Sequence, residues 1–398
     1  MTLMSVVPWV LAVFSGLGLL LSLAIVLPAP TMWILVFTVV APEISPWLVG
    51  VHAIALLLLA RLSLTGGIAI AILVSSLLGL SLSLLPLLQV PATINRFNSE
   101  MERGLGSDYL KTVPEPNRQA MRRQPLQLLD VFRGIPLPPV RIQREIPFAE
   151  PDGVSLKLNL YRPAAVGQYP TVIIIYGGAW RQGTPDNDEW FSRYLASRGY
   201  TVVAIDYRHA PKYQFPAQLE DVKTAIRVVC DRADEFGVDG DRIALMGRSA
   251  GGHLAMLAAY DPDAIPIRGL INYYAPVNLT NGYYDLPNPD PLGIQNILRD
   301  FLGGSPEELP DLYDRASPWH LIRPNLPPSL LIYGKRDHLV QAKFGRKLQE
   351  KLLQFKNRSI FLEIPWAEHA FDAVYFGISN QIALYYTERF LAHTLSKP

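Results

Sequence analysis

The chain has 398 residues, 49% of them hydrophobic, and its 36 basic and 35 acidic side chains leave a net charge of +1. This balance gives no indication of a nucleic-acid partner. The single cysteine, Cys230, excludes an internal disulfide and a cysteine zinc site. Because the sequence also lacks a P-loop, a dinucleotide fingerprint and a metal-ligand cluster, we expect no metal and no cofactor.

Only two charged side chains, Glu43 and Arg61, fall within the first 90 residues. In this part, segments 5–27 and 66–88 are each 23 residues long. A helix of that length measures about 35 Å, which is enough to cross a hydrocarbon core of about 30 Å. Runs this long and this free of charge predict membrane-spanning helices rather than buried helices of a soluble core.

A third apolar segment, 31–60, is interrupted between Pro42 and Pro46. It predicts either one kinked span, or a short re-entrant piece at 32–41 followed by a span at 46–60 of marginal length. We therefore expect residues 1–90 to form a transmembrane helical region of three spans, with four short spans as the alternative; the three spans are 5–27, 31–60 and 66–88.

The charges around the apolar segments predict how the chain is oriented. No Lys or Arg precedes the first segment, which argues against a cleaved signal peptide. Residues 96–144 carry nine Lys or Arg against five Asp or Glu, and the positive-inside rule places that flank on the cytoplasmic side. Arg61 would then face outward. We expect a multi-pass integral membrane protein, with the lipid bilayer as a partner and residues 141–398 in the cytoplasm.

The rest of the chain alternates between strand-like and helix-like segments. Such alternation predicts a mostly parallel sheet covered by helices on both faces, an α/β fold. Residues 278–320 interrupt the pattern and are rich in Pro, Tyr, Asn and Gly, which suggests a cap-like insertion over the strand ends. Residues 91–140 form a basic linker, either a tether or a second cap element. The expected strands are 141–148, 154–160, 171–176, 201–206, 242–247, 268–274, 329–333 and 359–364, and the main expected helices are 187–198, 217–236, 341–354 and 373–394.

A nucleophile motif lies between the strand at 242–247 and a helix-like run that begins near His253. The sequence Gly247-Arg248-Ser249-Ala250-Gly251 is G-x-S-x-G in the strand–turn–helix context that a nucleophile elbow requires. The sharp turn exposes the serine, and the flanking glycines avoid clashes there. Ser249 is therefore the candidate nucleophile.

Two further residues follow in the order that such a triad requires, first an acid and then a histidine. Asp337 comes just after the strand at 329–333, and His369 comes after the strand at 359–364. Strand ends of this kind meet at the edge where parallel sheets bind ligands. His369 would take the proton of Ser249, and Asp337 would orient the imidazole. His253, four residues after Ser249, is a rival base, but its helix leads away from this edge.

A glycine-rich loop follows the strand at 171–176, in the sequence Gly177-Gly178-Ala179-Trp180. Backbone amides in such a loop hold the oxyanion of the tetrahedral intermediate. We expect the donors to be the amides of Gly178, Ala179 and Ala250. The aromatic residues expected near the site either line an acyl pocket or belong to the core; they are Trp180, Tyr207 and Trp366.

With these motifs, residues from about 140 to 395 resemble the esterase/lipase branch of the α/β-hydrolase superfamily. The branch includes relatives of hormone-sensitive lipase and feruloyl-esterase-like, kynurenine-formamidase-like and isoprenylcysteine-methylesterase-like members. The chain departs from the family at Tyr176, where a His is usual, and this leaves the geometry of the oxyanion loop open. The residues that carry the resemblance are Gly177-Gly178-Ala179-Trp180, Gly183, Asp206-Tyr207-Arg208, Phe215-Pro216-Ala217, Glu220-Asp221 and Gly247 through His253.

The resemblance implies an α/β-hydrolase fold and a carboxylesterase- or lipase-type serine hydrolase. We expect a membrane-anchored enzyme in which Ser249, His369 and Asp337 cleave a small-molecule or lipid-derived ester through an acyl-enzyme. Two alternatives stay open: a catalytically degenerate fold that acts as a membrane-tethered binding module, and an acyltransferase with the same triad.

Overall fold

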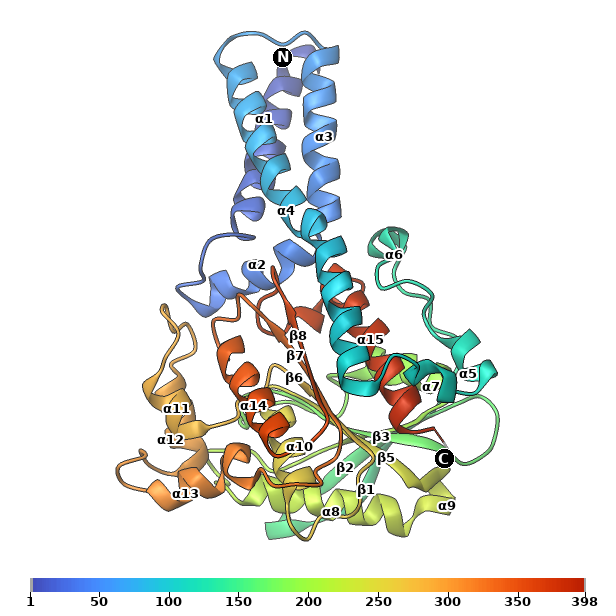
Figure 1. The fold of residues 1–398 in the computed structure, drawn as a ribbon. Helices are drawn as coiled ribbons and strands as arrows, with labels where there is room; N and C mark the ends of the chain where they lie inside the picture. The colour runs from blue at the N-terminus through green and yellow to red at the C-terminus, as the bar shows by residue number, and fades with distance from the viewer. Residues whose placement is uncertain (1–2, 397–398) are drawn as a thin grey trace.

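The computed structural model describes residues 3–396, which form a bundle of apolar helices joined to an α/β domain (Figure 1). The α/β domain is built on one eight-stranded sheet in the order β1-β2-β4-β3-β5-β6-β7-β8. The β1–β2 and β2–β4 pairs are antiparallel, and every other neighbouring pair is parallel. The strands are β1 (Arg141–Ala149), β2 (Leu156–Arg162), β3 (Tyr169–Ile175), β4 (Thr201–Ile205), β5 (Val238–Arg248), β6 (Gly269–Tyr273), β7 (Ser329–Gly334) and β8 (Ser359–Ile364).

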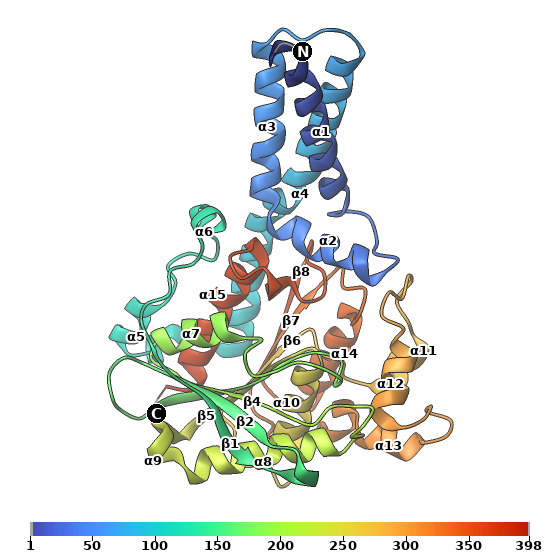
Figure 2. The ribbon, with the colours of Figure 1, turned by 180° about the vertical axis from the view of Figure 1, so that it is seen from behind.

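Helices cover both faces of this sheet, and the predicted α/β-hydrolase fold class is confirmed. One face is covered by α8 (Ala217–Asp231), α10 (Ala250–Tyr260) and α14 (Ala342–Gln354). The other face is covered by α7 (Glu189–Ser197) and α15 (Ile378–Thr394), as Figure 2 shows from behind. The helix expected at 217–236 ends at Asp231, and a separate turn, α9 (Ala233–Phe236), follows it.

Between β6 and β7 the chain forms the predicted insertion, which contains three short α-helices and a 3₁₀ turn. They are α11 (Leu279–Tyr284), α12 (Ile294–Leu302), α13 (Pro310–Arg315) and η3 (Pro318–Leu321). The remaining 3₁₀ turns are η1 (Tyr109–Thr112), η2 (Pro151–Gly153) and η4 (Phe371–Ala373), and the helices α5 (Glu115–Ala120) and α6 (Leu128–Arg133) precede the sheet.

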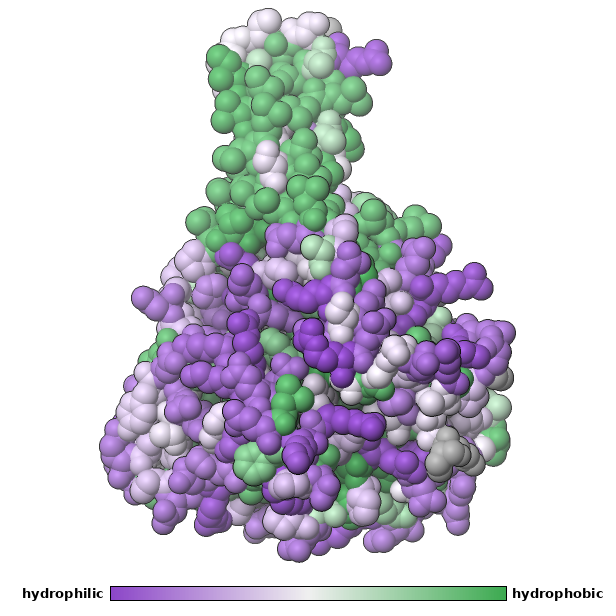
Figure 3. Space-filling model, viewed as in Figure 1, coloured by the Kyte–Doolittle hydropathy of each residue, from purple (hydrophilic) through white to green (hydrophobic). Residues whose placement is uncertain are grey.

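Three helices of the N-terminal region lie side by side in the bundle: α1 (Leu3–Leu23), α3 (Ser45–Arg61) and α4 (Gly66–Leu105). Helix α2 (Met32–Glu43) is bent by 78° from α3 and lies against the α/β domain. Within residues 3–396, two helices are long and apolar enough to cross a membrane, or three if α2 and α3 count as one broken span. The prediction of three spans therefore stays a prediction. The face of the bundle that Figure 3 shows is mostly hydrophobic.

Helix α4 runs without a break from the bundle into the α/β domain, whereas the sequence predicted a span that ended at 88 and a linker from 91. Its apolar stripe continues past the bundle, since Val90, Phe97 and Met101 are buried at helical spacing. The ring of Phe97 packs edge-on against Tyr386 of α15, with the centroids 5.3 Å apart. One helix thus belongs to both parts of the protein and fixes their relative position.

Polar groups join the bundle helices from inside. Ser22 of α1 lies 2.9 Å from the hydroxyl of Ser83 of α4 and 3.2 Å from Nε2 of His52 of α3. Hydrogen bonds of this kind hold apolar helices together where no hydrophobic force favours their association. Gly79 of α4 lets His52 approach closely, because a Cβ atom at Gly79 would lie 2.2 Å from Nε2 of His52.

A Gly79→Leu substitution is therefore expected to destabilise the bundle by about 1–3 kcal/mol, the usual cost of overpacking. Thermal unfolding of the full chain in detergent would show a lower midpoint. Gly50→Leu on α3 is the control, since a Cβ atom there has no neighbour within 4 Å. Equal midpoints for the two variants would contradict the packing described here.

Candidate active site

Ser249 lies in a strained turn between β5 and α10. Its backbone has φ 48° and ψ −121°, a combination that side-chain-bearing residues rarely adopt. The turn is possible because the first helical turn passes very close to β3. A Cβ atom at Gly251 would lie 2.0 Å from the carbonyl oxygen of Ile175, and one at Gly247 would lie 2.3 Å from Gly251. Both glycines of the motif are therefore required by the space available.

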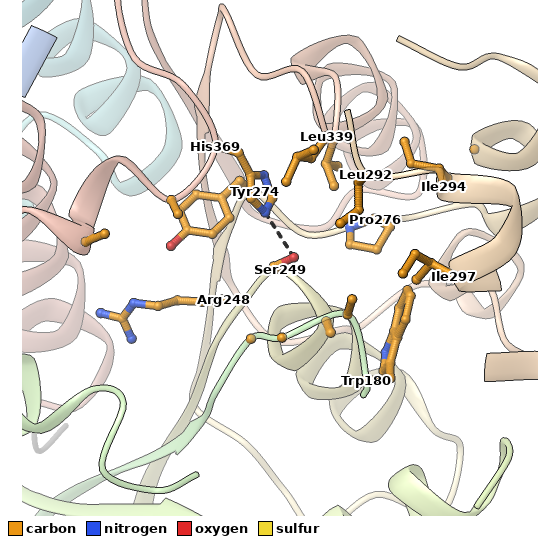
Figure 4. A pocket seen from close by; sticks show the side chains of 18 of the residues that line it. Trp180, Arg248, Ser249, Tyr274, Pro276, Leu292, Ile294, Ile297, Leu339 and His369 are labelled. Atoms are coloured by element: carbon orange, nitrogen blue, oxygen red, sulfur yellow. Dashed lines mark hydrogen bonds between the residues drawn. The ribbon is translucent and has the colours of Figure 1, made fainter. Parts of the chain in front are cut away.

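The structure brings together the three side chains that the sequence predicted. His369 Nε2 lies 3.0 Å from Ser249 Oγ, and His369 Nδ1 lies 2.7 Å from Asp337 Oδ2. The dashed line in Figure 4 marks the bond between Ser249 and His369. The second carboxylate oxygen of Asp337 accepts the amides of Leu339 and Val340 at 2.8 and 2.7 Å. The acid is thereby held in one orientation toward the histidine.

Glu368 connects the loops that carry the acid and the histidine. Its Oε1 accepts the amide of His338 at 2.6 Å and the amide of His369 at 3.0 Å. The side chain is buried, and its Oε2 is hydrogen-bonded to the ring of His338. Because one carboxylate holds the residue after Asp337 and the backbone of His369 together, Glu368 fixes the distance between the two loops.

The electrostatic environment suits His369 as a proton acceptor. Burial disfavours its cation, but the charge of Asp337 and the hydrogen bond to it outweigh that effect, so the pKa of His369 lies above its usual value. The charges of Glu368 and Asp372 also raise this pKa. A histidine with a raised pKa is a stronger base toward the hydroxyl of Ser249.

The loop after β3 has the backbone conformation expected of an oxyanion loop. Gly178 has φ +141°, and a Cβ atom there would lie 1.9 Å from the carbonyl oxygen of Gln182. Within residues 3–396, the amides of Gly178 and Ala179 donate to no protein acceptor. Ala250 is the first residue of α10, where helix amides have no partner within the helix. All three residues line the same cavity as Ser249.

Tyr176, the residue that departs from the family pattern, supports this loop from behind. Its hydroxyl donates to Asp206 Oδ1 at 2.5 Å and lies 2.9 Å from Nε2 of His209. Its ring stacks on Tyr207 with the centroids 4.5 Å apart. Gly183 packs against the ring, since a Cβ atom there would lie 2.4 Å from it. The tyrosine is anchored at the start of the loop, away from the reacting atoms.

A cavity of about 420 Å³ opens beside Ser249, within the size range of small-molecule sites. Figure 4 shows apolar side chains on one side of Ser249, among them Leu292, Ile294 and Ile297 of the cap insertion, and the Arg248 side chain on the other. The cap-like insertion at 278–320 therefore forms part of the cavity wall. The apolar side includes Trp180, Pro276, Leu292, Ile294, Ile297 and Leu339.

The opposite side of the cavity is lined by polar side chains, most of which form ion pairs or hydrogen bonds with one another. The Arg248 guanidinium is ion-paired with Asp372 and lies 3.2 Å from Asp188 Oδ1. Tyr274, whose ring centroid is 4.6 Å from that of His369, donates its hydroxyl to Asp372. Burial raises the pKa of Asp188, with the charge of Asp372 adding to this and Arg248 opposing it. This cluster fixes the wall next to His369.

Of the three aromatic residues predicted near the site, only Trp180 lines the cavity. Its ring stacks on Phe301 with the centroids 4.2 Å apart. Tyr207 is buried and donates to the carbonyl oxygen of Tyr176, because the chain after β4 passes behind the oxyanion loop. Trp366 is buried against α15, where its Nε1 donates to Ser379 Oγ at 2.9 Å. Both belong to the core.

His253, the rival base, has a structural role. Its Nδ1 accepts the Nε1–H of Trp180 at 3.2 Å, and its Nε2 lies 2.6 Å from the carbonyl oxygen of Ala316. Burial lowers its pKa to about 4, although the bond to Ala316 opposes the shift. A neutral ring with both nitrogens occupied connects the cavity wall to the cap insertion.

Several residues at the site were not predicted from the sequence. Asp372 and Glu368 lie within three residues of His369, so their proximity along the chain was the available signal. Asp188 and Tyr274 carry no such signal. Met32 of α2 also lines the cavity, although it belongs to the predicted membrane region. In the part of the chain that the structure describes, no group of three or more His, Cys, Asp or Glu is placed to hold a metal ion.

Comparison with known proteins identifies relatives of the α/β domain. The BD-FAE family model matches residues 158–352. Esterase LipC of Mycobacterium tuberculosis is 34% identical over 215 residues, which are 51% of this chain and 53% of LipC. The probable carboxylic ester hydrolase LipM of that organism is 28% identical over 306 residues, 70% of this chain and 67% of LipM. The chain thus spans about half to two thirds of the length of these relatives.

Among solved structures, a hyperthermophilic esterase from the archaeon Pyrobaculum calidifontis is similar, with 25% identity and a TM-score of 0.56. The match covers 72% of this chain and 91% of the archaeal one. The α/β domain is therefore similar, in sequence and in fold, to proteins that are named as esterases or carboxylic ester hydrolases. In sequence and in fold, the α/β domain thus resembles the esterase branch of the α/β-hydrolase superfamily.

An Asp337→Asn variant is expected to lose about 10⁴-fold in kcat, because the amide disturbs the tautomer of His369. It also removes the charge that raises the pKa of His369. Catalysis needs the neutral ring, so activity falls as the pH drops through this pKa. The acid limb of kcat/KM for a soluble p-nitrophenyl ester should therefore move to lower pH in the variant.

The control is Asp314→Asn, which changes an exposed carboxylate on α13. Its pH profile should match that of the unmodified chain. An acid limb that stays at the same pH in Asp337→Asn would show that Asp337 does not set the pKa of His369.

Proposed function

We propose that this chain is a membrane-anchored serine hydrolase that cleaves carboxylic esters through an acyl-enzyme on Ser249. The proposal rests mainly on one observation, the hydrogen-bonded series from Ser249 through His369 to Asp337. This series lies beside an apolar cavity and next to amides that have no acceptor among the residues that the structure describes. The arrangement corresponds to the nucleophile, base, orienting acid and oxyanion donors of acyl transfer.

In the acylation step, Ser249 Oγ attacks the ester carbonyl carbon while its proton passes to His369 Nε2. The carbonyl oxygen becomes an oxyanion, which accepts hydrogen bonds from the amides of Gly178, Ala179 and Ala250. The ester C–O bond then breaks, and the departing alcohol takes the proton from His369. Asp337 stabilises the imidazolium between these two transfers.

In the second step, water attacks the acyl carbon and gives a proton to His369. The bond between the acyl carbon and Ser249 Oγ breaks, the serine recovers its proton from His369, and a carboxylic acid leaves. The apolar wall of the cap insertion suits a hydrocarbon acyl group, because burying apolar surface favours binding by about 25 cal/mol per Å².

The proposed anchor consists of α1, α3 and α4, with residues 1–90 as the membrane domain. In this arrangement the α/β domain (141–398) lies on the cytoplasmic side, together with the basic flank at 96–144. Arg61 is the last residue of α3, and this helix ends at the end of the bundle away from the α/β domain (Figure 1). One positive charge there is outweighed by the nine in the flank.

Replacing the nucleophile tests the proposal. The full chain in nanodiscs should hydrolyse p-nitrophenyl esters, and Ser249→Ala should lower kcat by about 10⁴–10⁶-fold. A fluorophosphonate probe, which forms a covalent bond with activated serines, should label the unmodified chain and not this variant. Ser99→Ala, on an exposed part of α4, should keep both properties.

A folded chain that is neither labelled nor active would contradict the proposal and favour a binding module. Labelling with transfer of the acyl group to an added alcohol, and no release of acid, would instead indicate an acyltransferase. Labelling that persists in Ser249→Ala would place the nucleophile elsewhere.

A further inference from the structure

Helix α2 presents a row of apolar side chains to solvent although it lies outside the bundle. Trp33 is 85% exposed, Val36 56% and Phe37 52%. Large apolar side chains that are this exposed and contiguous indicate a surface that contacts another apolar phase. The axis of α2 is bent by 78° from that of α3. If α3 crosses a bilayer, α2 lies roughly in the plane of the bilayer surface.

A second exposed apolar group lies under the bundle on α6. Leu129 is 60% exposed, Leu128 51% and Phe132 46%. Figure 1 shows α2 and α6 on either side of the lower end of the bundle, and Figure 3 shows a hydrophobic area over α6. Helix α6 is tied to the bundle, because Nε1 of Trp47 on α3 donates to the carbonyl oxygen of Val131 at 3.0 Å.

The inner side of α2 is fixed to the α/β domain by polar contacts. Glu43 is fully buried, and its Oε2 accepts the amide of Ser379 at 2.7 Å. Just before α2, the carbonyl oxygen of Val26 accepts a hydrogen bond from Arg336 at 2.6 Å. Arg336 directly precedes Asp337. Both contacts reach segments next to the site, so the position of α2 relative to the cavity is fixed.

Met32, the first residue of α2, connects the outer face of this helix to the cavity. It lines the cavity and is also 42% exposed, so it lies at the boundary between the cavity and the outer surface. Its neighbour Trp33 is the most exposed residue of the row. The apolar wall of the cavity is therefore continuous, through Met32, with the apolar outer face of α2.

We propose that α2 and α6 seat the α/β domain on the surface of the lipid bilayer, and that long-chain acyl esters enter the cavity from the bilayer past Met32. The substrate class rests on the proposed esterase function, whereas the seating does not. Tryptophan, phenylalanine and leucine suit the bilayer surface, since amphipathic helices embed such side chains at the boundary of headgroups and acyl chains. The ester carbonyl then reaches Ser249 while the acyl chain stays in apolar surroundings throughout.

The seating is tested by fluorescence quenching in nanodiscs. In a full chain with Cys230→Ser, single cysteines are introduced by Trp33→Cys, Leu129→Cys or Val166→Cys and labelled with an environment-sensitive dye. Val166 is 88% exposed on the loop before β3, at the end of that parallel strand opposite to Ser249. Nitroxide-labelled lipids should quench the dye at 33 and 129 and leave the dye at 166 unaffected. Equal quenching at all three positions would overturn the proposal.

The route of the substrate is tested with a charged surface on α2. A Trp33→Asp/Phe37→Asp variant changes two side chains that do not line the cavity. Its kcat/KM should fall by about tenfold or more for a long-chain ester embedded in the bilayer, because charged side chains disfavour the interface. Its kcat/KM for soluble p-nitrophenyl acetate should stay within about twofold. Val166→Asp should leave both values unchanged.

The results distinguish the two parts of the proposal, which are the seating of the α/β domain on the bilayer and the entry of the substrate from the bilayer. An equal loss for both esters in the folded variant would mean that α2 acts on the site itself and not on entry from the bilayer, and would overturn the proposed route. An unchanged kcat/KM of the double variant on the embedded ester would also overturn the proposed route. If the unmodified chain hydrolyses neither ester, the proposed esterase function fails, and the quenching experiment alone decides whether the domain is seated on the bilayer.

Discussion

The close approach of the first turn of α10 to the end of β3 is the constraint on which the site depends. The carbonyl oxygen of Ile175 occupies the space that a side chain at residue 251 would need, so the backbone turns sharply and Ser249 takes a strained conformation. The same approach brings the amide of Ala250 beside the loop that follows β3. One packing contact between a strand and a helix therefore positions Ser249 and the amides of Gly178, Ala179 and Ala250 together.

The acid and the histidine reach this point through a different set of interactions. Glu368 holds the loops after β7 and β8 together by accepting an amide from each, and Asp337 is oriented by two amides of its own loop. The apolar bundle is joined to the same region, since α4 continues into the core and Glu43 of α2 caps the backbone at Ser379. The apolar bundle and the geometry of the site are thus coupled through buried contacts.

Much of this arrangement is predictable from the sequence, because local patterns determine it. Runs of β-branched residues define the strands, and residues that directly follow parallel strands must meet at one edge, which places Ser249, Asp337 and His369 together. The contributions of Tyr207, Trp366 and Met32 are not predictable in this way. The first two depend on which way a loop turns after its strand, and Met32 depends on the bend between α2 and α3. Likewise, the length of α4 depends on Phe97 and Met101 finding a partner surface on the α/β domain.

The most direct test of the account is the position of the acyl group during turnover. The full chain in nanodiscs would be mixed with a p-nitrophenyl ester, quenched within the first turnover and mapped by peptide mass spectrometry. We expect a burst of p-nitrophenol and an acyl group on the peptide that contains Ser249. Turnover without a burst and without an acyl group, or an acyl group on another residue, would contradict the account.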